Sequence, residues 1–148
     1  MTATSRYTPG GGEGRQTEVP LGEPGTTVAA LTVADDLSEM ARVRNWARGL
    51  LADLPEDRCA DVVIVLDELV SNALRHGEPP REVRLVRRGG WMRIEVDDGC
   101  RDEACQRPAY NGGGRGIALI AACSLAWGQE QRQKGKTVWA ELTLTDAG

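Results

Sequence analysis

The stretch DELVSNALRHG, at residues 67–77, places a carboxylate and a carboxamide at a spacing suited to metal binding. Glu68 and Asn72 stand four residues apart, so on a helix they lie on the same face, one turn apart. Two oxygen ligands that converge in this way suit Mg²⁺, which binds oxygen and usually keeps several of its water ligands. This pair therefore predicts a hydrated magnesium site.

Two basic residues, Arg75 and His76, follow on the same face of the expected helix. A solvated polar surface is the alternative interpretation of this face, since charged residues mostly lie in water. Ile64 and Val65 count against it, because we place them on the same side as Glu68, where apolar residues indicate a partly covered surface. We expect the opposite side to face the core, with Cys59, Val62, Val63, Leu66, Leu69, Val70 and Ala73.

A glycine-rich segment, NGGGRG at residues 111–116, runs directly into the apolar sequence IALI. Unobstructed backbone N–H groups at the positive end of a helix form an anion site, to which Arg115 adds a positive charge. The segment lacks the GxxxxGK[ST] pattern of a P-loop, and no βαβ unit supports a dinucleotide site. The candidate phosphate-binding residues are Gly112, Gly113, Gly114, Arg115, Gly116 and Ile117.

A carboxylate follows the expected strand WMRIEVD at residues 91–97. Alternate residues of this strand are apolar, and the period of two places Asp98, not Asp97, on their face. A carboxylate there needs a hydrogen-bond donor, and the exocyclic amine of a purine would serve where no lysine or arginine does. The alternative is a carboxylate satisfied by turn amides at Gly99 and beyond.

Periodicity predicts the elements that position these side chains. Residues 26–33 predict a strand, after which Asp35 or Asp36 caps a helix that runs to about Leu54. Acidic residues near Pro55 and basic residues before Gly77 predict the ends of a second helix. Further along we expect a hairpin of residues 82–88 and 91–97, a loop at 99–113, a helix from about Gly116, and a hairpin of 127–133 and 136–144.

This order of elements predicts an α+β fold, a two-layer α/β sandwich in which helices cover one face of a mostly antiparallel sheet. Residues 1–25 contain six glycines and three prolines with few large apolar side chains, so we expect a disordered N-terminal tail. Residues 26–148 are expected to form one domain.

Composition excludes several classes of partner. The net charge is -4 and no basic stripe is present, which argues against nucleic acid and against an anionic membrane surface. No apolar run approaches the roughly 20 residues of a membrane span, and the first residues do not resemble a signal peptide, so we expect a cytoplasmic protein. The four cysteines form no CxxC pair, which predicts reduced structural thiols rather than a zinc site.

Together, DELVSNALRH, EVDDG and GGRGIALI resemble the N box and the two glycine boxes of the GHKL ATPase superfamily, which has the Bergerat or histidine-kinase-like ATPase fold. The resemblance covers about residues 26–145 and extends to small stand-alone members related to anti-sigma-factor serine/threonine kinases. It implies ATP and Mg²⁺ as cofactors, and transfer of the ATP γ-phosphoryl group to a serine of a partner protein.

The resemblance also implies individual roles. Asn72 would be the Mg²⁺ ligand, and Glu68 the acid that orients or deprotonates the attacking group. Arg75 occupies a position that is often basic and phosphate-facing in related kinases, and Asp98 would be the carboxylate that recognises adenine. In GKTVWAEL, which resembles the final strand of the family, Thr137 would support the adenine site.

One position departs from the D-x-G-x-G pattern of the family, because Cys100 stands where the first glycine after Asp98 is expected. A side chain there either crowds the adenine edge or is accommodated by an altered loop. The alternative function is therefore a non-catalytic, nucleotide-gated protein-binding module. A histidine-kinase fragment is disfavoured because no dimerisation helix with a phosphoacceptor histidine is seen, and an ATPase motor because no transducer domain is seen.

The resemblance implies a protein partner, either a sigma factor or an anti-anti-sigma-like protein. Homodimers are frequent in this branch, so a homodimer is also an open expectation. Trp91 on the first hairpin is the one local feature that supports it, and ordinary surface packing is the alternative for a lone tryptophan.

Overall fold

The computed structural model describes residues 25–101 and 114–145 of the 148-residue chain, with the side chains of residues 114–118 left undescribed. Residues 1–24 of the expected tail and 102–113 of the expected loop lie outside this part. The elements follow the predicted order: β1 (Thr26–Val33), α1 (Glu39–Leu50), α2 (Glu56–His76), β2 (Arg81–Arg88), β3 (Trp91–Asp98), α3 (Gly114–Cys123), β4 (Ala126–Arg132) and β5 (Gly135–Thr143).

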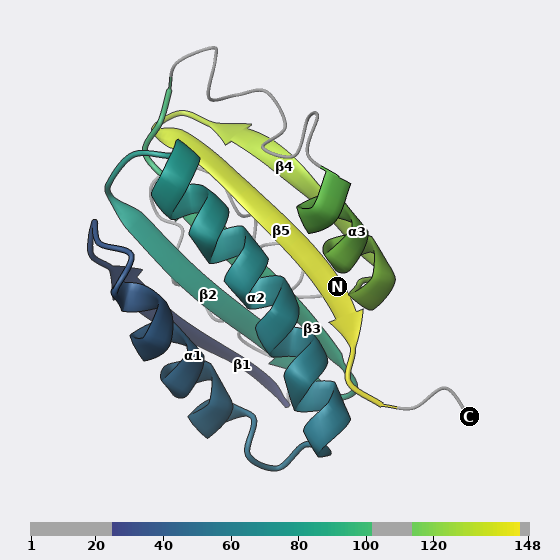
Figure 1. Ribbon diagram of the computed structural model, residues 1–148. Coiled ribbons are helices and arrows are strands. Elements are labelled where there is room, and N and C mark those ends of the chain that lie inside the picture. The colour runs from purple at the N-terminus through teal and green to yellow at the C-terminus, as the bar shows by residue number, and fades with distance from the viewer. Residues whose placement is uncertain (1–24, 102–113, 146–148) are drawn as a thin grey trace.

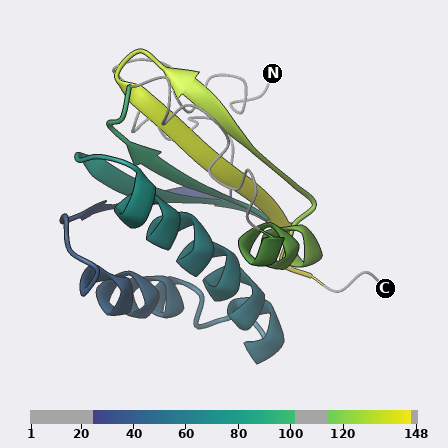
Figure 2. The same ribbon diagram turned by 45° about the horizontal axis from the view of Figure 1, so that its top comes forward.

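The strands form one sheet in the order β1-β2-β3-β5-β4, and every neighbouring pair is antiparallel. The helices α1, α2 and α3 lie on the same face of this sheet (Figure 1), and the turned view separates the helical layer from the strands (Figure 2). The predicted two-layer sandwich is therefore confirmed. Because side chains alternate across a strand, each strand gives one set of residues to the helical layer and another to the opposite face.

The core lies between the helices and the sheet, and α2 supplies most of its helical side. Burying one large aliphatic side chain of this kind stabilises the fold by about 1.5–3 kcal/mol. The strands contribute their alternate apolar residues, namely Val83, Leu85, Met92, Ile94, Val96, Val138, Ala140 and Leu142. The pattern that predicts Asp98 on the core side therefore describes β3 correctly.

Helix α1 is shorter at both ends than the sequence predicts. Asp36 does not cap it directly, since its carboxylate accepts the Ser38 N–H at 2.9 Å in a turn that precedes the helix. Glu39 then begins the helix and its carboxylate accepts the Ala34 N–H at 2.9 Å. At the other end the chain leaves the helix after Leu50, and the buried Leu51 anchors the connection to α2.

Helix α2 has the predicted length, but its buried surface is wider than one stripe. Val65, which we expected beside Glu68 on the outer face, is fully buried, whereas Ile64 is 38% exposed. The reason is that α2 lies between α1 and α3 as well as over the sheet, so neighbours cover its flanks. Val65 therefore does not show that the outer face of α2 is partly covered. The burial of Asn72, which does lie on that face, is the observation that supports it.

Candidate functional site

The predicted site residues come from three elements that meet at one end of the helical layer. Helix α3 runs antiparallel to α2 (Figures 1 and 2), and the Sγ atom of Cys123 in its last turn lies 3.9 Å from Oδ1 of Asp61 near the start of α2. The first turn of α3 therefore lies toward the C-terminal half of α2. Strand β3 ends there too, because a Cβ atom at Gly77 would lie 2.5 Å from the Asp98 carboxyl group.

Asn72 is a buried polar side chain with an unmet hydrogen-bonding group. It is only 8% exposed, and its Nδ2 atom is buried without a hydrogen-bond partner among the described residues. A buried donor left in this state costs about 1–3 kcal/mol. This amide is therefore better suited to a ligand than to the stability of the fold.

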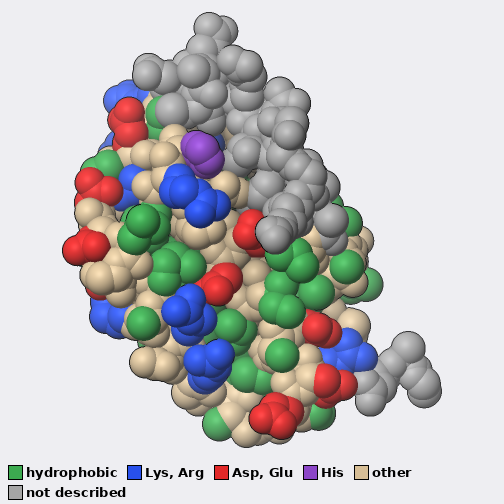
Figure 3. Space-filling view, in the orientation of Figure 1, with side chains coloured by type: hydrophobic (Ala, Val, Ile, Leu, Met, Phe, Trp, Pro, Cys, Tyr) green, Lys and Arg blue, Asp and Glu red, His purple; other side chains and the backbone are tan. Residues whose placement is uncertain are grey.

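Glu68 and Arg75 flank Asn72 on the same face of α2. The half-buried Glu68 carboxylate makes no hydrogen bond or ion pair within the described part of the chain, so it is available to a ligand or to a second protein. Arg75 is exposed, and its Nη2 atom lies 3.4 Å from Oγ of Ser71 one turn earlier. On the part of the helical face that described residues form, acidic and basic side chains are interspersed and make no continuous basic stripe (Figure 3).

The glycine-rich segment enters α3 two residues earlier than predicted. Gly114, Arg115, Gly116 and Ile117 form the first turn of the helix, whereas Gly112 and Gly113 lie outside the described residues. The first four N–H groups of any helix lack partners inside the helix and carry its positive dipole end. The expected anion site is thus the N-terminus of α3, which lies at the same end of the helical layer as Asn72.

Asp98 lies on the helical side of the sheet, as the alternation predicts, and is 1% exposed. Its Oδ1 atom accepts the Cys100 N–H at 2.9 Å, so the alternative prediction, that a turn amide satisfies this carboxylate, holds for one of its oxygens. Its Oδ2 atom lies 3.1 Å from Nζ of Lys136, which is equally buried. The expectation that no lysine or arginine reaches this carboxylate was therefore wrong.

Thr137 does not reach Asp98. The register of β3 and β5 pairs Asp98 with Lys136 and Asp97 with Thr137, so Thr137 lies on the opposite face of the sheet. There its hydroxyl donates to Oδ1 of Asp97 at 2.6 Å. Alternation along β5 contains the signal that the motif comparison missed, because the inward residues Val138, Ala140 and Leu142 share their face with Lys136.

The chain matches the histidine kinase-like ATPase domain over residues 33–142, from the end of β1 into β5. It belongs to this family. The matched segment contains all three converging elements and therefore every described residue of the site. No curated protein sequence matches the chain.

Most of these residues fit ATP and Mg²⁺, the cofactors that a histidine kinase-like ATPase domain implies. The N-terminus of α3 suits a phosphate, and the unmet amide of Asn72 suits a ligand that accepts a hydrogen bond through Nδ2 while Oδ1 faces a metal. The described residues contain no cluster of three His, Cys, Asp or Glu, so Mg²⁺ would take its other ligands from phosphate and water. Asp98 can accept a hydrogen bond from a purine amine at Oδ2 only where the Lys136 side chain moves away from that oxygen.

Two glycines that the motif comparison passes over allow the close packing around Asp98 in this domain. Gly77 leaves room for the Asp98 carboxylate against the end of α2. Gly135, at the start of β5, has a φ of +146°, and a Cβ atom there would overlap the backbone carbonyl of Asp98. Both positions thus require glycine for a local steric reason.

Arg81 is a further residue that the sequence analysis missed. It is buried, and its guanidinium group donates to the carbonyl oxygens of Ala73 at 2.7 Å and Gly77 at 2.9 Å at the C-terminus of α2, where the Ala73 carbonyl also accepts the Gly77 N–H. A third bond of 2.7 Å joins it to Asp35 after β1. Arg81 therefore fixes the end of the helix that carries Asn72 to the edge of the sheet.

The cysteines differ from the prediction at one position. Cys59 and Cys123 are free thiols, but Cys100 is disulfide-bonded, and its partner lies outside the described residues. Because Cys100 donates its N–H to Asp98, this cross-link begins directly beside the predicted adenine carboxylate. Among the described residues, no helix is long and apolar enough to cross a membrane.

Proposed function

We propose that this histidine kinase-like ATPase domain is an ATP-binding regulatory protein that phosphorylates a serine of a partner protein, in the manner of an anti-sigma-factor kinase. The observation that carries the proposal is the convergence of the buried, unmet amide of Asn72 with the N-terminus of α3 and with Glu68. A sigma factor or an anti-anti-sigma-like protein is the class of partner that fits this role.

Bound Mg²⁺-ATP would supply the γ-phosphorus and the charge neutralisation on which phosphoryl transfer depends. Asn72 would hold the metal through Oδ1, and the N–H groups at the start of α3 would hold phosphate oxygens. Glu68 would accept the proton of the partner's serine hydroxyl as the new oxygen–phosphorus bond forms. The bond between the γ-phosphorus and the bridging oxygen breaks, and the electron pair leaves with ADP.

The state of Glu68 supports catalysis over simple binding. Its carboxylate has no partner in the described part of the chain and lies one turn from Asn72, where an attacking hydroxyl would approach the phosphate. A carboxylate held in an ion pair at this position would be a weaker candidate for a base. Positioning and charge dominate phosphoryl transfer, so these few groups suffice.

A nucleotide-gated binding module is the second candidate, and the Asp98–Lys136 contact favours it. The 3.1 Å ion pair occupies one oxygen of the carboxylate that would recognise the adenine amine. Binding of ATP then requires Lys136 to move or the base to sit differently, which would lower the affinity and suit a regulatory role. In this case Glu68 would have no chemical step to perform.

The experiment measures Mg²⁺-ATP binding by calorimetry and then phosphoryl transfer to purified anti-anti-sigma-like proteins by mass spectrometry. We expect binding by the parent protein, loss of binding in Asn72→Ala, and serine phosphorylation that is lost in Glu68→Gln while ATP binding is kept. Arg48→Gln, at an exposed position in the last turn of α1, is the surface control and should behave as the parent.

Three results would discriminate between the candidates. ATP binding without transfer to any serine supports the binding module and overturns the kinase. Transfer that persists in Glu68→Gln removes the proposed role of that carboxylate. A folded parent protein that binds no ATP at all overturns both candidates.

A further inference from the structure

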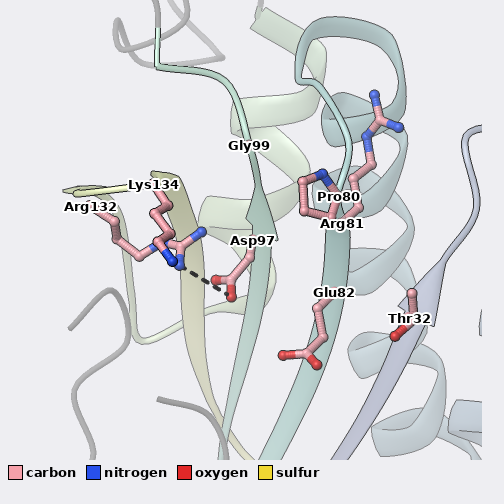
Figure 4. A pocket seen from close by; sticks show the side chains of 8 residues that line it. All are labelled: Thr32, Pro80, Arg81, Glu82, Asp97, Gly99, Arg132 and Lys134. Atoms are coloured by element: carbon pink, nitrogen blue, oxygen red, sulfur yellow. Dashed lines mark ion pairs between the residues drawn. The ribbon is translucent and has the colours of Figure 1, made fainter. Parts of the chain in front are cut away.

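A cavity of about 260 Å³ opens at the end of the sheet, on the face opposite the helices. Arg132 and Lys134 reach into its wall from the β4–β5 hairpin, and Asp97 and Glu82 line it from the neighbouring strands (Figure 4). Asp97 and Asp98 are consecutive in β3 and point to opposite faces, so this cavity is separate from the proposed nucleotide site.

Asp97 is the more buried of the two acidic residues in this cavity, and both of its carboxylate oxygens already accept hydrogen bonds. Asp97 accepts two hydrogen bonds of 2.8 Å from Arg84 and one of 2.6 Å from Thr137. Burial by itself would raise the pKa of Asp97, but these bonds and the nearby positive charges outweigh it and lower the pKa. Glu82 is also engaged, at 2.5 Å from Arg84. Arg84 is thus shared among three carboxylates, those of Asp97, Glu82 and Glu95, and Arg132 adds a longer ion pair with Asp97.

Arg132 is less closely engaged than Arg84. Its side chain is 9% exposed, its ion pair with Asp97 is 3.8 Å long, and its Nε atom is buried without a hydrogen-bond partner among the described residues. The remaining contact of the guanidinium group is a long one of 3.4 Å to the backbone carbonyl of Asp98. Lys134 beside it is exposed and has no ion pair with any described residue.

We propose that this cavity binds a small oxyanion, a molecule with carboxylate or phosphate oxygens, between the guanidinium group of Arg132 and the ammonium group of Lys134. A guanidinium group presents several N–H donors in one plane, which match the oxygens of such an anion. The cavity of about 260 Å³ is slightly smaller than the usual range for ligand sites, roughly 300–1,000 Å³, so a compact molecule fits best. This site extends the protein's function beyond the proposed nucleotide chemistry.

The test titrates inorganic phosphate, and separately succinate, into the full-length protein by calorimetry. We expect millimolar or tighter binding of at least one probe, weakened about tenfold or more in Arg132→Gln and several-fold in Lys134→Gln. Glu82→Gln should tighten binding several-fold, because it removes a negative charge from the wall of an anion site. Lys134 is exposed, so its variant keeps the test valid even where Arg132→Gln fails to fold.

Arg48→Gln, at an exposed position in the last turn of α1 outside both sites, is the control, and its binding of both probes should equal that of the parent. Arg75→Gln, on α2 on the other side of the sheet, reports binding at the proposed nucleotide site. Binding that is lost in Arg75→Gln but kept in Lys134→Gln would place the anion at the nucleotide site and overturn the proposal. Absence of binding by the folded parent, or weaker binding in Glu82→Gln, would also overturn it. None of these results depends on whether ATP binds.

Discussion

Replacing Lys136 with methionine removes the one cationic partner that the buried Asp98 carboxylate has among the described residues, and it keeps the length of the side chain. The ion pair is 3.1 Å long and its two side chains are 3% and 1% exposed. In the variant, Oδ1 of Asp98 still accepts the Cys100 N–H, but Oδ2 loses its positive partner in a site that water does not reach. The change therefore isolates the energetic consequence of an unpaired buried charge.

Removing one partner of a buried pair generally destabilises a protein by about 3–5 kcal/mol. For a domain of this size that corresponds to a fall in Tm of roughly 10–20 °C. Lys134→Met, in the same hairpin but exposed, should change stability by less than about 0.5 kcal/mol. The double variant Lys136→Met with Asp98→Asn should recover most of the loss, because no unpaired charge then remains.

The same variant should bind ATP more tightly than the parent protein. Adenine no longer has to displace Lys136 from the Asp98 carboxylate, and the purine amine would satisfy the oxygen that the mutation leaves unpaired. A gain of about tenfold in affinity corresponds to about 1.4 kcal/mol. Urea unfolding gives the stability change, and calorimetry with Mg²⁺-ATP gives the affinity.

Two results would refute this reasoning. A loss below about 1 kcal/mol in Lys136→Met would mean that the pair is not buried in solution, since a surface pair contributes at most that much. Weaker ATP binding in a folded variant would mean that Lys136 holds the nucleotide instead of competing with it. Lys136 would then be a residue that contacts bound ATP, and not one that pairs with Asp98 only when ATP is absent.

Three further predictions follow from single contacts. Asn72→Ala should leave the free energy of unfolding unchanged or raise it by up to about 1 kcal/mol in urea, because it removes a buried Nδ2 group that has no hydrogen-bond partner among the described residues; a loss above about 2 kcal/mol would show a structural role. Gly77→Ala should destabilise by about 1–3 kcal/mol, since its Cβ would lie 2.5 Å from the Asp98 carboxyl group, and an unchanged Tm would exclude this close packing. The hydrogen bond from Arg42 and that from Ala34 lower the pKa of Glu39 from 4.5 to about 2, so its stabilisation is present above pH 4.5 and is lost as the pH falls toward 2; Glu39→Gln should flatten the dependence of Tm on pH in that window, and an equal slope would contradict it.

Much of the fold could be predicted because it depends on local patterns. Alternating apolar residues define the strands and their inward faces, and acidic and basic ends define α2. The placement of Asp98 on the helical side follows from the period of two alone. The start of α1 could not be predicted as well, because the carboxylates of both Asp36 and Glu39 can accept backbone N–H groups near the start of a helix. The geometry of the connection after β1 decides at which residue the helix begins.

The positions of the candidate residues in the fold follow the prediction where a motif stands on one element, and they differ from it where two elements meet. Asn72 and Asp98 each belong to a single helix or strand, and their burial follows from that element's own period. Thr137 was assigned by its place in a motif, but the pairing of β5 with β3 gives Asp98 to Lys136. Val65 is buried by neighbouring helices, which no property of α2 itself reveals.

The sequence by itself determined the order of the elements and the inward face of each strand, and it supplied the residues that we propose bind phosphate and Mg²⁺. These are properties of neighbouring residues, governed by backbone geometry and side-chain chemistry. Only the tertiary structure decided that the start of α3 lies toward the Asn72 end of α2. It also decided that Arg84 pairs with Asp97 while the Nε–H of Arg132 has no partner among the described residues. Such contacts join residues far apart in the chain, and strand register and helix packing fix them through the burial of the whole core.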